Sequence, residues 1–469
     1  MGDTFAIKPH PETTAVNAAV DTEGKSLEDG NATAVSLAGP PVAHEERACH
    51  PDQGAHVPES SQTLSPDLDD LLSFEAVNEP RTFYKRLRDT DPVYWNARWN
   101  GWILTEYEDV AAGFRDHDRL SSDRFEGPFA KDLTGSAERY QQLIDFMNKW
   151  MFTKDRPYHT HLRSLINTAF TPKSVEVLRP RIRELVRELA EPLRDRETVN
   201  FLGEFAFTLP VVVIAEYLGV PAEGRHQLRQ WSEDLGAVIF FEGQNPNRFE
   251  TGAQAMQGLV DLIRPIVRAR ASEPRDDLIS GMVHADIDGE RFTEDEIIAN
   301  VVLMVFAGHE TTMNLLSNGV VAFDMFPGTW QQIAEDPRMV RTAVEEVLRF
   351  DGPIRGLARW AREGFELRGK QIKKFDRLLL VQHGANHDPK FFERPEQFDP
   401  ARWPNKHLGF GQGIHTCLGA PLARLEAQEA YAYLSEEFSG IEVLTSDLRY
   451  NKTLSSRSLQ SLDVRFRQR

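Results

Sequence analysis

The chain has 469 residues, of which 41% are hydrophobic, and a formal net charge of −18. This length suffices for a large core in one big domain or two ordinary ones, while the acidic balance argues against nucleic-acid binding. Its two cysteines, Cys49 and Cys417, exclude a disulfide framework and favour a reducing, cytoplasmic location. No secretory signal is visible, and no apolar run reaches the roughly 18 residues that span a bilayer, so we expect a soluble protein.

The N-terminal segment, residues 1–66, is rich in Ala, Pro, Glu, Thr, Ser and Gly and has no hydrophobic periodicity. We therefore expect a disordered tail, followed by one large folded domain at 67–469. The segment 92–104 is typical of a β-hairpin, with Asn100-Gly101 as its turn. From there to about residue 350 the pattern is mostly helical, and a strand-like piece returns around residues 378–380. The predicted fold class is mainly α with small β-sheets (α+β).

Two predicted helices carry unusual residues. One begins near Pro157 and holds His159 and Arg163 on a single face, because they are four residues apart. The other begins at Thr293, where Thr-Glu-Asp-Glu matches a capping box, and ends before Pro327-Gly328. At roughly 30 residues it is long enough to cross the whole molecule.

The middle of this long helix reads Ala-Gly-His-Glu-Thr-Thr over residues 307–312. Gly308 leaves room for a flat group, and the Thr311 hydroxyl can bond back to the preceding turn and open the helix locally. Together with Glu310 this makes a candidate proton relay. The alternative is a helix crossing that uses small residues for packing.

Further along, Glu346 and Arg349 are three residues apart and share a helical face. Their neighbours are apolar, which predicts partial burial, and a buried ion pair is costly to break. Taken alone, such a spacing is more often a solvated pair.

The most informative segment is Phe-Gly-Gln-Gly-Ile-His-Thr-Cys-Leu-Gly, residues 410–419. Gly411 and Gly413 permit tight turns that deliver Cys417 to the start of a helix running from Leu418 to about Phe438. The free N–H groups and dipole of a helix N-terminus favour a thiolate, so the loop predicts a single soft ligand for a metal centre. A buried free cysteine is the alternative. A zinc site is disfavoured because His415 and Cys417 are too few ligands.

Four cationic side chains accompany this loop and, with it, can clamp two carboxylates of a ligand: His159, Arg163, Arg359 and His415.

These motifs together resemble the cytochrome P450 family, in its soluble bacterial form, over essentially all of 67–469. The loop at 410–419 matches the haem-binding loop, 307–311 the oxygen-activation motif, and 159–163 the propionate-contacting helix. Glu346 and Arg349 match the buried pair that Arg402 completes. The resemblance implies the P450 fold, haem b with Cys417 as proximal iron ligand, propionate contacts from His159, Arg163, Arg359 and His415, and proton relay through Glu310 and Thr311. Glu310 stands where many relatives have Asp.

The activity that the resemblance implies is insertion of one oxygen atom of O2 into a C–H bond of a small lipophilic substrate. An anionic sulfur ligand favours O–O cleavage. Electrons are expected from NAD(P)H through a separate ferredoxin and reductase, with the ferredoxin docking on the cysteine side near Lys154, Arg156, Lys406 and Arg424. The alternatives are a haem-thiolate peroxygenase or reductase, and a haem binder or sensor without turnover. The presence of both Glu310 and Thr311 weighs against them.

For the substrate pocket, the resemblance indicates Met304, Ala307, Ile354 and Arg355, with apolar walls from Phe146, Met147, Trp150, Val238, Ile239, Phe240 and Phe241. An inward-facing Arg355 would favour a carboxylate-bearing substrate, because an unpaired buried cation is costly.

Overall fold

The computed structural model describes residues 66–129, 140–222, 225–239 and 247–469. All of them belong to one compact unit, 57–469. The expected tail lies outside the described residues except for its last member, Pro66, which begins a short 3₁₀ helix that ends at Asp69. The domain boundary at residue 67 therefore remains a prediction.

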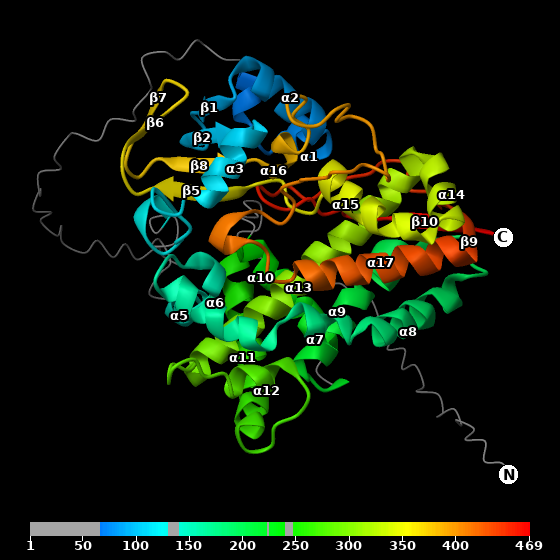
Figure 1. The fold of residues 1–469 in the computed structure, drawn as a ribbon, viewed down its shortest axis with the longest axis horizontal. Coiled ribbons are helices and arrows are strands. Elements are labelled where there is room, and N and C mark those ends of the chain that lie inside the picture. Colours follow the sequence, from blue (N-terminus) through cyan, green and yellow to red (C-terminus); the bar gives the residue numbers. More distant parts are fainter. Residues whose placement is uncertain (1–65, 130–139, 223–224, 240–246) are drawn as a thin grey trace, which may run out of the picture. The chain divides into compact units, whose positions relative to one another are not determined.

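Helices form most of the described chain (Figure 1). In chain order they are α1 (Phe74–Asn78), α2 (Pro80–Thr90), α3 (Tyr107–Arg115), α5 (Gln141–Met147), α6 (Tyr158–Ala169), α7 (Pro172–Glu176), α8 (Arg179–Ala190), α9 (Thr208–Leu218), α10 (Arg225–Ile239), α11 (Arg248–Ser272), α12 (Leu278–Val283), α13 (Glu294–Met325), α14 (Pro327–Glu335), α15 (Val340–Asp351), α16 (Gln382–Ala385) and α17 (Ala420–Glu437).

The strands form small sheets. The largest described sheet has the order β1 (Val93–Asn96), β2 (Gly101–Leu104), β8 (Arg377–Leu380), β5 (Leu357–Ala361) and β3 (Leu120–Ser121). A second joins β4 (Val199–Asn200), β10 (Asp463–Gln468) and β9 (Phe438–Val443), and β6 (Phe365–Leu367) pairs with β7 (Lys370–Ile372). The predicted α+β class is confirmed.

The predicted hairpin is present, because β1 pairs antiparallel with β2. Its turn occupies residues 97–100, and Asn100 takes the left-handed conformation with φ of 54°. Gly101 already belongs to β2, so the turn lies slightly earlier than the sequence indicated.

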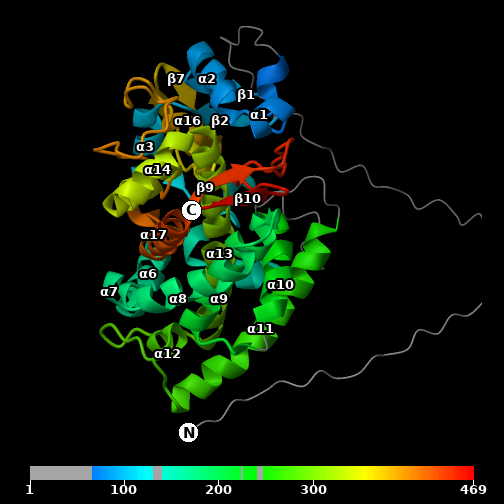
Figure 2. The same cartoon turned by 90° about the vertical axis from the view of Figure 1, so that its right-hand side faces the viewer.

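The long helix α13 lies at the centre of the described unit, with the large sheet, α1, α2 and α16 on one side and α11 and α12 on the other (Figures 1 and 2). Its predicted cap is confirmed: Thr293 Oγ1 accepts from the Glu296 N–H, and Glu296 accepts from the Thr293 N–H at 2.8 Å. It runs for 32 residues and packs against α9, α11, α15 and α17 within the main hydrophobic core. It remains continuous through 307–312, so the helix is not opened there.

The predicted ion pair is fully buried. Arg349 donates to Glu346 through Nε at 2.9 Å and Nη2 at 2.8 Å, and neither side chain is exposed. Arg402 donates to the same carboxylate at 3.0 Å, as does Asn405. This cluster fixes α15 to the irregular segment that leads into the cysteine loop.

Candidate active site

The cysteine loop is shaped by two glycines and a helix start. Gly411 and Gly413 have φ of 64° and 74°, in the left-handed region that favours glycine. A Cβ on Gly413 would also approach the Phe114 carbonyl to 2.6 Å, so only glycine fits there. The Cys417 N–H bonds to the Phe410 carbonyl at 3.0 Å, which closes the loop three residues before α17 begins.

The Cys417 side chain is exposed, but its exposure is toward an internal cavity that it lines, not toward the outer surface. Burial within the protein raises the pKa of its thiol. Backbone N–H groups of Gly419 and Ala420 hydrogen-bond the sulfur and oppose that rise. The helix start therefore supplies the donors that hold a thiolate once a positive partner is present.

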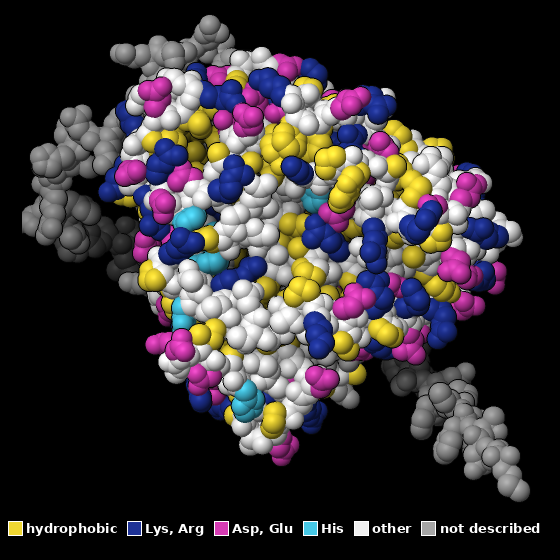
Figure 3. Space-filling model, in the orientation of Figure 1, with side chains coloured by type: hydrophobic (Ala, Val, Ile, Leu, Met, Phe, Trp, Pro, Cys, Tyr) yellow, Lys and Arg dark blue, Asp and Glu magenta, His cyan; other side chains and the backbone are white. Residues whose placement is uncertain are grey.

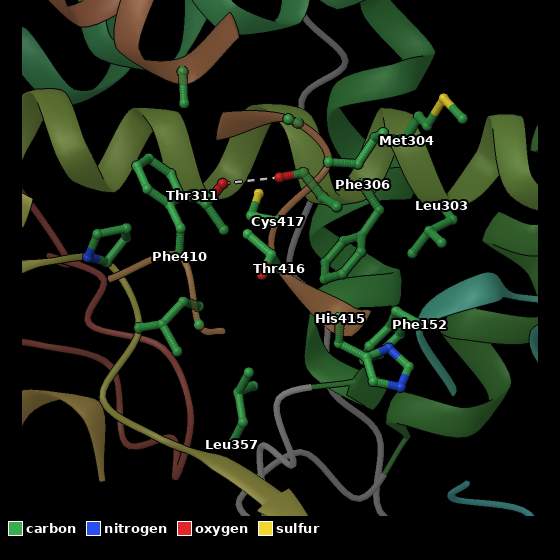
Figure 4. Close-up of a pocket in the computed structure, with 18 of the residues that line it drawn as sticks. Phe152, Leu303, Met304, Phe306, Thr311, Leu357, Phe410, His415, Thr416 and Cys417 are labelled. Carbon is green, nitrogen blue, oxygen red and sulfur yellow. Dashed lines mark hydrogen bonds between the residues drawn. The ribbon is translucent and has the colours of Figure 1, made fainter. Parts of the chain in front are cut away.

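The cavity lies between α13 and the cysteine loop (Figure 4). On the α13 side it is lined by Met304, Ala307, Gly308, Thr311 and Thr312; on the loop side it is lined by Phe410, Gly411, Cys417, Leu418 and Gly419. Apolar side chains close the rest, among them Phe114, Met151, Phe152, Ile214, Ile239, Leu303, Ile354 and Leu357. The walls suit a flat, apolar ligand.

One edge of this cavity is cationic. It brings together the four predicted side chains His159, Arg163, Arg359 and His415. The two imidazole rings lie 4.2 Å apart between centroids, and both nitrogens of His159 and Nε2 of His415 are buried without a hydrogen-bond partner among the described residues. Burial, and then nearby arginines, lower the pKa of His159 to about 4 and of His415 to about 2. Unpartnered donors beside cations indicate a site for an anionic ligand.

Two buried arginines reinforce this electrostatic environment. Burial lowers the pKa of Arg359 to about 10, and burial followed by the charge of Arg359 lowers the pKa of Arg124 to about 10. Arg359 Nη1 donates to its neighbour's carbonyl at 2.8 Å, and Arg124 donates to the Ile239 carbonyl at 3.2 Å at the end of α10. Sequence reasoning gave no role to the Arg124 charge, because nothing in the Ser-Ser-Asp-Arg string distinguishes it from a surface cation.

These features fit haem. A porphyrin needs a flat apolar slot, one soft axial ligand and cations for two propionates, and the cavity offers each of them. Within the described ranges no three His, Cys, Asp or Glu side chains gather in a way that could hold a metal ion.

Glu310 and Thr311 do not face the same space. Thr311 lines the cavity with Cys417, and its hydroxyl donates to the Ala307 carbonyl at 2.8 Å, the dashed bond of Figure 4. Glu310 lines a second, polar cavity, which also includes Glu233, Asp234 and Ser456. The Glu310 carboxylate lies close to Gly236 of α10. A Cβ added to Gly236 would be 2.8 Å from the Glu310 Oε2 atom.

Arg355 requires a correction, because it does not line the cavity. Its guanidinium is buried and donates to three backbone carbonyls and the Tyr84 hydroxyl, at 2.6–3.3 Å. It therefore joins α1, α2 and the segment near Thr453, a structural role that sequence spacing from Arg359 did not reveal.

Other pocket expectations are met in part. Met304, Ala307, Ile354 and Ile239 line the cavity, whereas Phe146, Met147, Trp150 and Val238 do not appear among its lining residues. Phe240 and Phe241 lie outside the described residues. Sequence reasoning missed Phe152 and Leu303, although Phe152 is two residues from a predicted wall residue and Leu303 precedes Met304.

Known proteins share this architecture. The cytochrome P450 family model matches residues 327–445. Polyketide biosynthesis cytochrome P450 PksS of Bacillus subtilis is 36% identical over 400 residues, 82% of this chain and 96% of the relative. 6-Deoxyerythronolide B hydroxylase of Saccharopolyspora erythraea is 33% identical over 395 residues, which cover 81% of this chain and 95% of the relative.

Among solved structures, P450BioI in complex with an acyl carrier protein ligated to hexadec-9Z-enoic acid superposes with a TM-score of 0.78 at 33% identity. The match covers 85% of this chain and 100% of that one. Among the described residues, no helix has the length and apolar character needed to cross a bilayer. The apolar cavity with its cationic edge, the cysteine loop and these extensive similarities agree, and the chain belongs to the cytochrome P450 family, as a haem b-dependent monooxygenase.

Proposed function

We propose that Cys417 would hold the haem iron through its sulfur and that α13 would line the side of the haem cavity across from the cysteine loop. The observation that carries the proposal is the position of the Cys417 sulfur, which lines one apolar cavity together with Thr311 of α13. When bound, the haem supplies the oxidation chemistry, activating dioxygen and inserting one of its oxygen atoms into a substrate C–H bond. The chain positions the substrate, excludes water and delivers protons.

The cationic edge supports a role in anchoring the two haem propionates. His159 and His415 have unpartnered ring nitrogens that can donate to carboxylates, and Arg163 and Arg359 supply permanent charge. A carboxylate beside each imidazole would raise the histidine pKa from its lowered value, because an opposite charge favours the protonated form.

For proton delivery, we assign the final hydroxyl to Thr311 and the acid to Glu310. The Thr311 oxygen, while donating to the Ala307 carbonyl, keeps lone pairs that can accept a proton from water or an acid. Glu310 lines the second cavity, whose polar residues are suited to hold water. Protons would therefore enter through the second cavity and reach the haem side at Thr311.

The substrate is expected to be a lipophilic chain. The cavity walls above the loop are mostly apolar, which favours burial of hydrocarbon. PksS carries polyketide biosynthesis in its name, and the P450BioI complex holds an unsaturated C16 acid on a carrier protein. We propose that the substrates include lipophilic chains that carry a carboxylate, because the positively charged Arg124 lines this cavity.

Electrons are expected from NAD(P)H through a reductase and a ferredoxin that docks on the cysteine side. Figure 3 shows several Lys and Arg side chains on the face over α15 and α17. Exposed Arg115, Arg341 and Lys406 belong to segments next to the loop and α17, whereas Arg424 is paired with Glu345 and Lys154 with Asp123. A cationic face favours an acidic partner. We propose a cytoplasmic location, where such donors operate.

The ligand assignment is tested by replacing the sulfur. Cys417→Ser should abolish the thiolate-type carbon monoxide spectrum of the reduced, haem-loaded protein. Cys49→Ser is the matched control and should keep that spectrum. Persistence of the thiolate-type band in Cys417→Ser would overturn the assignment.

A further inference from the structure

One buried amide on α13 makes no side-chain hydrogen bond among the described residues. Asn314 is only 1% exposed, and neither its Nδ2 nor its Oδ1 has a hydrogen-bond partner among the described residues. Two other asparagines of the same helix behave differently. Asn300 bonds backbone groups at residues 149, 151 and 296. Asn318 Nδ2 donates to the carbonyls of residues 351 and 457, although its Oδ1 has no partner among the described residues.

This arrangement disfavours a purely structural explanation for Asn314. A buried donor and a buried acceptor left without partners each cost free energy of desolvation, with no hydrogen bond in return. A leucine of similar size would fill the same space without that cost. The amide therefore needs a partner that the present side-chain arrangement does not provide.

Helix geometry identifies the nearest candidates. At 3.6 residues per turn, Asn314 lies about 40° around the helix from Glu310 and about 60° from Thr311, on the arc between them. Helical side chains also lean toward the N-terminus, so the Asn314 amide is directed toward the turn that carries Glu310 and Thr311. Glu310 lines the second cavity and Thr311 the haem cavity. Asn314 lines neither of these two cavities, but helix geometry places it between the two directions.

We propose that Asn314 is a positioning residue for proton delivery, and this rests on the proposed roles of Glu310 and Thr311. When the Glu310 carboxyl turns from the second cavity toward Thr311, Asn314 Nδ2 donates to it. When the Thr311 hydroxyl turns from the Ala307 carbonyl into the haem cavity, its oxygen accepts a hydrogen bond from the Glu310 O–H and its own proton points into that cavity. A proton then passes from the Glu310 carboxyl to the Thr311 oxygen, Thr311 releases its own proton to the haem cavity, and water in the second cavity returns a proton to Glu310.

The first test measures stability, without turnover. Asn314→Leu removes two unpartnered polar groups, so its melting temperature should equal or exceed that of the unchanged protein. Asn318→Leu, the matched control one turn further along, removes two made hydrogen bonds and should melt at a lower temperature. A drop for Asn314→Leu as large as that for Asn318→Leu would show that Asn314 is bonded in the fold and would overturn the proposal.

The second test measures how electrons are used. With a surrogate ferredoxin and reductase, NADH and hexadec-9Z-enoic acid as the probe, the fraction of electrons released as hydrogen peroxide is recorded. Asn314→Leu should raise this fraction several-fold, and Asn318→Leu should leave it unchanged. Because Asn314 acts through Glu310, the double variant Glu310→Gln/Asn314→Leu should release no more peroxide than Glu310→Gln alone.

An unchanged peroxide fraction in Asn314→Leu, or additive effects in the double variant, would overturn the proposal. The carbon monoxide spectrum is recorded for every variant first. Loss of the thiolate-type band from the unchanged protein would refute the proposed function itself, whereas failure of the Asn314 prediction in a protein that keeps this band refutes only the positioning role.

Discussion

Arg402, in the segment before the cysteine loop, donates a 3.0 Å hydrogen bond to the carboxylate of Glu346 on α15, although 56 residues separate them. Glu346 also receives Arg349, so one fully buried carboxylate holds two arginines. Arg349 Nη1 in turn donates to the carbonyls of Asn386 and Pro395. The cluster thus fixes the path of the chain that positions Cys417.

Glu346→Ala should therefore be among the most damaging substitutions outside the cavity. It leaves two arginines without their shared counter-charge, one of them fully buried, and breaking such a pair costs about 3–5 kcal/mol. Urea unfolding should show this loss in the free energy of unfolding. Glu363→Ala, at an exposed position, is the control and should change stability by less than about 0.5 kcal/mol. A loss below about 1 kcal/mol for Glu346→Ala would contradict the structural role.

Local sequence signals predicted the parts of the site that depend on nearby residues. The cap at Thr293, the turns at Gly411 and Gly413, and the Glu346–Arg349 pair each follow from short-range backbone or helix geometry. Side-chain direction was harder to predict. Arg355 and Arg359 both follow Pro353, yet one is bonded to distant carbonyls and the other lines the cavity. That difference depends on contacts with α1 and α2, far away in sequence.

The same limit applies to the motif at 307–312. Sequence placed Glu310 and Thr311 together as a relay, because they are adjacent. Adjacent helical residues point about 100° apart, so their side chains reach different cavities. The pairing of acid and hydroxyl therefore requires a movement or a bridging group that no pattern of residue types reveals.

Thr311→Ala should divert electrons from product to peroxide. The substitution removes the cavity-facing hydroxyl that accepts and passes on a proton, while the apolar walls and the cysteine loop remain. NADH oxidation should continue, with a several-fold higher peroxide yield per electron pair. Thr312→Ala is the matched control: Thr312 also lines the cavity, but its side chain is buried and its hydroxyl is bonded to the Gly308 carbonyl, so the peroxide yield should change little. Equal yields in both variants would remove the special role of Thr311.

His159→Phe should weaken haem binding without weakening the cofactor-free protein. Both ring nitrogens of His159 are buried without partners among the described residues, so an apolar ring costs the apoprotein little. A propionate contact worth about 1.5–3 kcal/mol would be lost, which raises the haem dissociation constant about ten- to a hundredfold. Transfer of haem to an acceptor globin measures this change. His161→Phe, two residues along α6, should leave the transfer rate unchanged.

Arg124→Leu tests whether the cavity recognises a carboxylate on the substrate. Spin-shift titrations would compare hexadec-9Z-enoic acid with the corresponding alcohol. If Arg124 meets the carboxylate, affinity for the acid should fall about tenfold or more, whereas affinity for the alcohol should hold or rise, because burial disfavours the cation. An equal loss for both ligands, together with faster haem loss, would instead assign Arg124 to a propionate. Arg355→Leu should lower stability, not selectivity.

A final prediction concerns acid stability. Burial raises the pKa of Glu345, but hydrogen bonds from Arg424 and His407 outweigh it and lower the pKa to about 2. Because the folded-state value lies below the unfolded one, near 4.3, this group stabilises the fold above about pH 4.3 and loses that contribution as the pH falls toward 2.

Glu345→Gln should therefore be less stable than the unchanged protein at neutral pH, by about 3 kcal/mol, and the difference should shrink as the pH falls from about 4.3 toward 2. Urea unfolding midpoints across that range measure the gap. Glu363→Gln, at an exposed position, should follow the unchanged protein throughout. A stability difference that stays constant with pH would contradict this prediction. It would mean that the Gln variant loses packing, because only the ion pair depends on deprotonation of the carboxyl group.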